Sequence, residues 1–145
     1  MMKSARRRAR EGLVQGLYQS LLAGHGGREI EAHLLEQEHL ARADKTFFSN
    51  TLAGILDNTG QLDTMLAPFL DRAPEALSPV ERSILWLAAF ELRHYPETPF
   101  RVIINEAVEL AKRYGGTDGH KYVNGVLDRL AVQERPLELR PIPPG

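Results

Sequence analysis

The chain of 145 residues is long enough to bury a core of its own, as one domain or two small subdomains. It has no cysteine, which excludes disulfides, thiolate catalysis and thiolate metal sites, and its 43% hydrophobic and 26% charged composition is that of a soluble globular protein. No apolar run approaches the roughly 18 residues that cross a bilayer, and no secretory signal opens the chain, so we expect a cytoplasmic protein.

Positive charge is concentrated at the N-terminus. The chain carries 18 basic and 19 acidic residues, yet its start is purely basic as far as Glu11, through Lys3, Arg6, Arg7, Arg8 and Arg10. This asymmetry favours a polyanionic partner, because clustered cations attract phosphates and release counterions on binding. The alternative interpretation is a solvated, frayed end.

Helical periodicity runs through the chain, which predicts an all-α fold. The first helix is expected over residues 4–23 and carries a stripe of small side chains that would let another helix approach closely: Ala5, Ala9, Gly12, Gly16, Ser20 and Ala23. An unpaired charge in a core is very costly, so we expect the basic residues on the apolar arc of this helix to overhang the bundle. These residues, the cationic tip, are Lys3, Arg6, Arg7 and Arg10.

A second helix is expected over residues 29–40. Asp44 is the predicted N-cap of a long third helix that Pro68 kinks or ends. The connector that follows divides the chain into an N-terminal subdomain of three helices over residues 1–72 and a C-terminal subdomain of three to four helices over residues 73–131. A flexible proline-rich tail is expected over residues 132–145.

The C-terminal half has clear helix boundaries. Residues 78–81 form a capping box with proline at the first helical position, and the helix they start must end before Pro96. Thr98 and Pro99 start another helix, which Gly115 ends, and a last helix runs to Ala131. We expect Asn105 and Asn124 to be buried between helices, and Glu109 to pair with Arg113 one turn later.

No catalytic, metal or cofactor site is predicted, because the histidines are scattered and the glycines at residues 115–119 lack phosphate-loop spacing. The start of the last helix is more informative. His120, Lys121 and Tyr122 place an aromatic ring beside a cation, a combination that single-stranded RNA recognition uses but that is a weak signal on its own. Tyr122 could equally pack in the core.

Three segments together resemble the NusB family of bacterial transcription antitermination factors. They are residues 5–11 (ARRRARE) with Gln15, Leu17 and Tyr18 following, residues 102–112 (VIINEAVELAK) and residues 116–128 (GTDGHKYVNGVLD). The resemblance extends over residues 4–131 and implies an all-α fold of two helical bundles.

The resemblance also implies a function. Members bind boxA-type sequences in nascent RNA together with a small-subunit ribosomal protein, Nus factor E, and join the RNA polymerase complex that suppresses termination in ribosomal RNA operons. The implied RNA-binding residues are Lys3, Arg6, Arg7, Arg10, Asp118, His120, Lys121 and Tyr122. Tyr18 and Glu81 match the positions where the protein partner is expected to dock.

Two positions depart from the family pattern: Tyr122 stands where phenylalanine is more common, and Gly119 replaces the usual serine, which removes a possible hydroxyl cap. A rival interpretation is a homodimeric helical scaffold without sequence-specific RNA binding, in which the small-residue stripe mediates self-association. A homodimer could also coexist with the RNA role.

Overall fold

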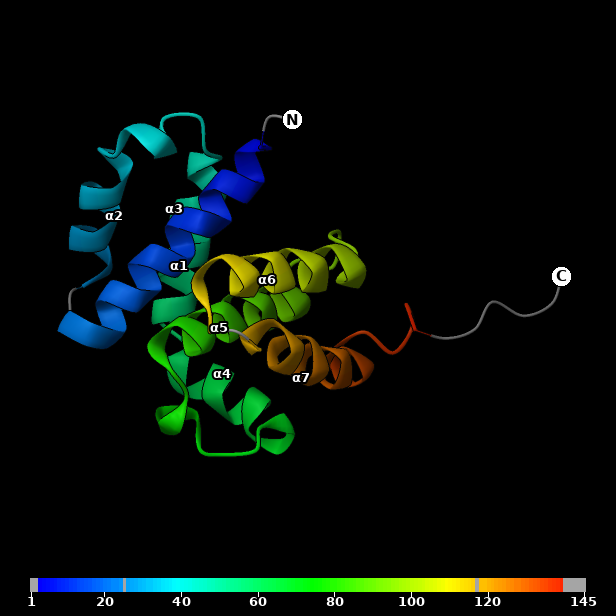
Figure 1. Ribbon diagram of the computed structural model, residues 1–145. Coiled ribbons are helices and arrows are strands. Elements are labelled where there is room, and N and C mark those ends of the chain that lie inside the picture. The colour runs from blue at the N-terminus through cyan, green and yellow to red at the C-terminus, as the bar shows by residue number, and fades with distance from the viewer. Residues whose placement is uncertain (1–2, 25, 117, 140–145) are drawn as a thin grey trace, which may run out of the picture.

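The structure, a computed structural model, describes residues 3–24, 26–116 and 118–139, and its regular elements there are all helical, which confirms the predicted all-α class (Figure 1). The α-helices are α1 (Ala5–Ala23), α2 (Gly27–Leu35), α3 (Lys45–Leu56), α4 (Thr59–Leu66), α5 (Pro79–His94), α6 (Phe100–Tyr114) and α7 (Gly119–Glu134). Short 3-10 turns η1 (Glu38–Leu40), η2 (Ala67–Phe69) and η3 (Pro74–Ala76) join them.

Helices α1, α3 and α5 start at capping residues in the sequence. The side chains of Ser4, Asp44 and Ser78 each accept a backbone N–H from three residues later, at 3.0, 3.0 and 3.1 Å. These bonds satisfy N–H groups that have no partner within their own helix. At the other end of α1, Gly24 adopts the left-handed conformation with φ of 68°, which ends the helix.

The second and third predicted helices are shorter than expected. Helix α2 ends at Leu35, and the chain continues through η1. The predicted long third helix is wrong: it is broken into α3 and α4, because the Asn58 side chain donates to the Gly54 carbonyl at 2.7 Å and takes the place of a helical N–H.

Helix α5 lies at the centre of the molecule. Every residue from Ser83 to Leu92 is buried, and α1, α3, α4, α6 and α7 all contact this helix. In Figure 1, α1, α2 and α3 lie together on one side, while α6 and α7 run beside α5 on the other. The core is therefore continuous between the two halves of the chain.

The middle of the small-residue stripe of α1, Ala9 to Gly16, is covered by the chain's own side chains, while Ala5 and Ala23 at its ends are exposed. A Cβ at Gly12 would lie 2.9 Å from a methyl of Leu40, and one at Gly16 would lie 2.8 Å from a methyl of Ile30. The stripe thus lets α2 and η1 approach α1 closely, as its composition predicts. Its centre is not available as the self-association surface that the scaffold interpretation requires.

The expected tail begins later than the sequence indicated. Helix α7 continues to Glu134, and the buried Arg135 donates to the carbonyls of Leu92 at 2.7 Å, Tyr95 at 2.9 Å and Thr98 at 3.0 Å. These include carbonyls at the end of α5 that lack a helical donor, so the arginine caps that helix. Residues 140–145 of the expected tail lie outside the described residues.

Candidate nucleic-acid interface

Arg10 is buried, and its predicted place in an exposed cationic tip is wrong. Its guanidinium donates to both carboxylate oxygens of Glu91 on α5, at 2.9 and 2.7 Å, and the two side chains are 4% and 2% exposed. The Phe47 ring lies 5.4 Å from the guanidinium. A charge can be buried here because its counterion is buried with it, and Arg10 is therefore out of reach of a phosphate.

The other three residues of the cationic tip remain at the surface, each with an acidic neighbour. Lys3 lies 2.9 Å from Glu11, Arg6 lies 3.3 Å from Asp44, and Arg7 lies 2.9 Å from Glu106. Their side chains are 36%, 40% and 45% exposed. The hydrogen bond to Glu106 raises the pKa of Arg7, so its charge is fixed. Surface ion pairs of this kind are weak, and a phosphate can compete with the carboxylates for these cations.

The start of α7 forms a second polar group. Lys121 lies 3.5 Å from Asp118, and both side chains extend into solvent. Tyr122 is half-buried against the core, and its hydroxyl donates to the Asp71 carboxylate at 2.9 Å and accepts the Asp71 backbone N–H at 3.2 Å. The Arg72 guanidinium lies 5.6 Å from the centre of the Tyr122 ring. The ring is thus held by the connector between α4 and α5, with a cation beside it.

Arg72 and Tyr122 together set the ionisation of Asp71. Hydrogen bonds from Arg72 and then Tyr122 lower the pKa of Asp71 to about 2. Burial raises the pKa of the Tyr122 hydroxyl, so it stays protonated and donates. Sequence reasoning missed Asp71 and Arg72, because their position in an irregular connector gives no periodic signal.

Gly119 leaves room for Glu81 beside the start of α7. A Cβ at this position would lie 3.1 Å from a carboxylate oxygen of Glu81. A carboxylate is favoured at a helix N-terminus, where unpaired N–H groups and the helix dipole give a partial positive charge. The residue expected to dock the protein partner therefore lies directly against a segment expected to bind RNA.

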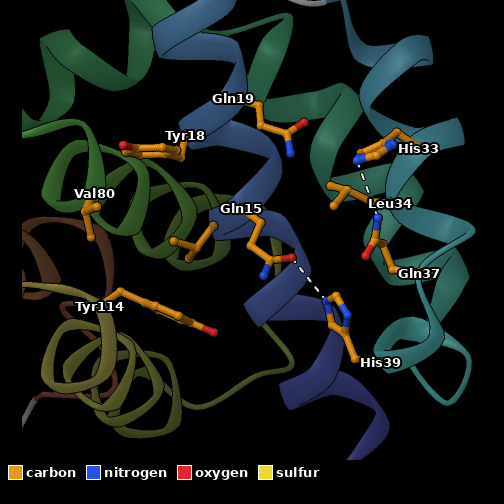
Figure 2. A pocket seen from close by; sticks show the side chains of 10 residues that line it. Gln15, Tyr18, Gln19, His33, Leu34, Gln37, His39, Val80 and Tyr114 are labelled. Atoms are coloured by element: carbon orange, nitrogen blue, oxygen red, sulfur yellow. Dashed lines mark hydrogen bonds between the residues drawn. The ribbon is translucent and has the colours of Figure 1, made fainter.

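Tyr18 lies at the rim of an apolar cavity of about 460 Å³ (Figure 2). Its walls come from α1, α2, α5 and α6, and include Val14, Leu34, Val80 and Tyr114. Polar side chains surround this apolar area, with His39 bonded to Gln15 at 3.1 Å and His33 close to Gln37 at 3.4 Å. Tyr18 is 38% exposed, so part of its ring is accessible at this rim. Sequence reasoning did not single out Tyr114 as a residue of this cavity.

Three further expectations are wrong. Asn105 and Asn124 are exposed, so neither satisfies backbone groups between helices. Arg113 pairs with Glu11 of α1 at 2.8 Å, while Glu109 lies 3.4 Å from Lys112. Spacing within one helix allowed the Glu109–Arg113 pair, but the packing of α1 beside α6 offers Arg113 a more buried carboxylate.

Neither a metal site nor a membrane segment is found in the part of the chain that the structure describes. No three histidine, aspartate or glutamate side chains there are grouped as metal ligands. None of the described helices is long and apolar enough to span a bilayer.

Cations at one end of the first helix and an apolar cavity beside an exposed tyrosine are the main surface features of this helical fold. The sequence model described as the NusB family matches residues 7–132. The chain belongs to the NusB family, as the resemblance predicted.

Named relatives match over nearly the whole chain. The transcription antitermination protein NusB of Aromatoleum aromaticum is 54% identical over 94% of this chain and 94% of its own. That of Thiobacillus denitrificans is 50% identical over 95% of each. Among solved structures, T. maritima NusB is 33% identical with a TM-score of 0.80, covering 90% of this chain and 92% of its own. A crystal structure of antitermination factors NusB and NusE in complex with dsRNA has the same fold, with a TM-score of 0.77 at 22% identity over 89% of this chain and 97% of that one.

Arg10→Ala is expected to lower the free energy of unfolding by about 3–5 kcal/mol, because it leaves Glu91 buried without its counterion. Replacing both partners, as Arg10→Met with Glu91→Leu, should restore most of the loss. Arg7→Ala removes an exposed pair and should cost about 1 kcal/mol or less. Urea unfolding monitored by circular dichroism measures all three variants. Equal losses from Arg7→Ala and Arg10→Ala would contradict the structural role of the buried pair.

Tyr122→Phe is expected to raise the pKa of Asp71 above its value of about 2, because one of its hydrogen bonds is lost while Arg72 remains. Because the pKa of Asp71 in the folded protein lies below its ordinary value of 3.8, its stabilising contribution is complete above that value and is lost as the pH falls toward 2. An NMR titration of the Asp71 carboxyl carbon measures the shift. Tyr114→Phe, which lies away from Asp71, is the control, and identical Asp71 titrations in both variants would rule out the bond.

Proposed function

We propose that this protein is an RNA-binding transcription antitermination factor that acts in the cytoplasm on boxA-type nascent RNA. In this proposal it binds the RNA together with the ribosomal protein that serves as Nus factor E, and the complex joins RNA polymerase in ribosomal RNA operons. The relatives at 50% identity or more carry the name transcription antitermination protein. The observation that carries the proposal is the set of partly exposed cations that remains at the start of α1 once Arg10 is assigned to the core.

Two groups of side chains are proposed to contact RNA. Lys3, Arg6 and Arg7 would bind phosphates, which position a strand without reading its sequence. Residues 118–122 at the start of α7 would contact the bases, with the Tyr122 ring as a stacking surface once Arg72 moves aside or stacks with the base. Arg10 is no longer part of this set, because it is buried against Glu91.

The cavity beside Tyr18 is proposed to receive the protein partner. An apolar area with a polar rim and an exposed tyrosine is typical of the centre of a protein interface. Val80 lines this cavity, and the neighbouring Glu81 lies against Gly119. Partner docking at Tyr18 and Glu81 would therefore border the RNA-contacting start of α7.

Arg6→Ala combined with Arg7→Ala is expected to flatten the slope of log affinity against log salt by about 1.4, since each phosphate contact on a single strand contributes roughly 0.7. Fluorescence anisotropy with a labelled boxA-type RNA at several salt concentrations measures the slope. Arg28→Ala with Arg93→Ala removes the same charge from other surfaces and should leave the slope nearly unchanged. A homodimeric scaffold would show no such slope in the unmodified protein.

Saturating partner protein is expected to raise RNA affinity by a factor within the typical coupling range of about 5–150-fold. Tyr18→Ala should abolish this gain and leave the weaker RNA binding of the protein alone intact, because Tyr18 lies at the cavity and away from the proposed RNA contacts. This variant isolates partner docking better than Glu81→Lys, which would also disturb Gly119. Equal RNA affinity with and without partner would exclude coupling between the two surfaces.

A further inference from the structure

The C-terminal end of α6 adds two cations beside α1 that the sequence analysis did not place among the RNA-binding residues. Lys112 and Arg113 are both 52% exposed. Arg113 approaches one oxygen of Glu11 to 2.8 Å, and Lys3 approaches the same oxygen to 2.9 Å. The Glu11 side chain is only 11% exposed, so a single largely buried carboxylate holds two cations from distant parts of the chain next to each other.

This carboxylate compensates only part of the positive charge around it. Its second oxygen is buried and has no hydrogen-bond partner among the described residues. One negative charge therefore serves two cations, and both keep N–H donors that are not used by Glu11. Lys3 and Arg113 can direct those donors at one phosphate, which accepts several charge-assisted hydrogen bonds at once.

Cations outnumber acidic groups in the shallow grooves around Glu11. The basic residues that line them are Lys3, Arg7, Arg8, Lys112 and Arg113, and the acidic residues are Glu11, Glu106 and Glu109. Glu106 is engaged by Arg7, and Glu109 forms only a long, exposed contact with Lys112. The surface where α1 meets α6 is therefore positive overall.

The position of this surface follows from the order of the elements. Helix α6 ends at Tyr114, and the chain reaches the start of α7 at Gly119. The end of α6 thus lies beside α1 through the Glu11–Arg113 pair and leads directly to Lys121 and Tyr122. An RNA strand that contacts both the start of α1 and the start of α7 would pass the end of α6 between those two contacts.

We propose that Lys3 and Arg113, held side by side by Glu11, form a phosphate-binding corner that carries an RNA strand from α1 to α7. Lys3 and Arg113 make the contacts, and Glu11 is a positioning residue. The proposal rests on the RNA-binding function proposed above. It adds Arg113 as a contact and gives a negatively charged side chain a favourable role in binding a polyanion.

The test uses a charge-matched pair of variants. If charge alone mattered, Glu11→Gln and Glu109→Gln would both strengthen RNA binding, because each removes one negative charge near the strand. We expect Glu109→Gln to do so, and Glu11→Gln instead to weaken binding several-fold, because Lys3 and Arg113 are no longer held together. Arg113→Ala should flatten the salt slope by about 0.7, the value for one phosphate contact.

A double variant separates positioning from a general effect on the fold. Glu11→Gln should have a smaller further effect on the salt slope when Arg113 is already alanine, since only the Lys3 contact then remains for Glu11 to position. Anisotropy with a labelled single-stranded boxA-type RNA provides the slopes, and urea unfolding confirms that each variant is folded under the binding conditions. Arg113 is exposed, so Arg113→Ala stays informative even if Glu11→Gln is unstable.

The outcomes distinguish this proposal from the proposed function. If Arg113→Ala leaves the slope unchanged while Arg6→Ala with Arg7→Ala flattens it, the corner is wrong and RNA binding stands. The corner is also wrong if Glu11→Gln strengthens binding as much as Glu109→Gln does. If the unmodified protein shows no salt-dependent RNA binding, the proposed function itself fails.

Discussion

The buried pair of Arg10 and Glu91 is the interaction on which the rest of the surface depends. It fixes how α1 is rotated and where it lies along α5, because neither charge can be buried without the other. Arg7 and Glu11 lie one turn apart on the same face of α1. The rotation of α1 that buries Arg10 therefore points both side chains toward α6. There they meet Glu106 and Arg113 at 2.9 and 2.8 Å. The core contact thus determines which cations reach solvent.

A single helix positions both proposed binding surfaces. The start of α1 carries Lys3, Arg6 and Arg7, and its later turns carry Tyr18 at the cavity. Because the helix is held rigidly by its glycines against α2 and η1 and by Arg10 against α5, the distance between the two surfaces is fixed. In the proposed function, RNA and a protein partner would bind side by side, and Glu81 next to Gly119 would bring the two proposed surfaces into contact.

The sequence was informative where the controlling interactions are local. Ser4, Asp44, Ser78 and Gly24 mark helix ends because each cap bonds within a few residues, and family motifs identified the fold. The burial of Arg10 could not be predicted from the sequence, because its counterion, Glu91, lies 81 positions away and meets Arg10 only in the folded protein. The break at Asn58 was hidden because apolar residues continue on both sides of it. Asn105 and Asn124 interrupt apolar segments, yet each occupies the solvent side of its helix, which only the packing decides.

The ion pairs of α1 also determine when the packing of this helix can be completed during protein synthesis. Arg10 and Arg7 find their carboxylates 81 and 99 positions further along the chain. Helix α1 leaves the ribosome long before those carboxylates are translated, and pairing across such separations comes late because closing long loops is slow. Until then Arg7 and Arg10 stay hydrated and unpaired, although α2 and α3 can already pack on α1. The first helix to be made therefore completes its ion pairs only after α5 and α6 have been made.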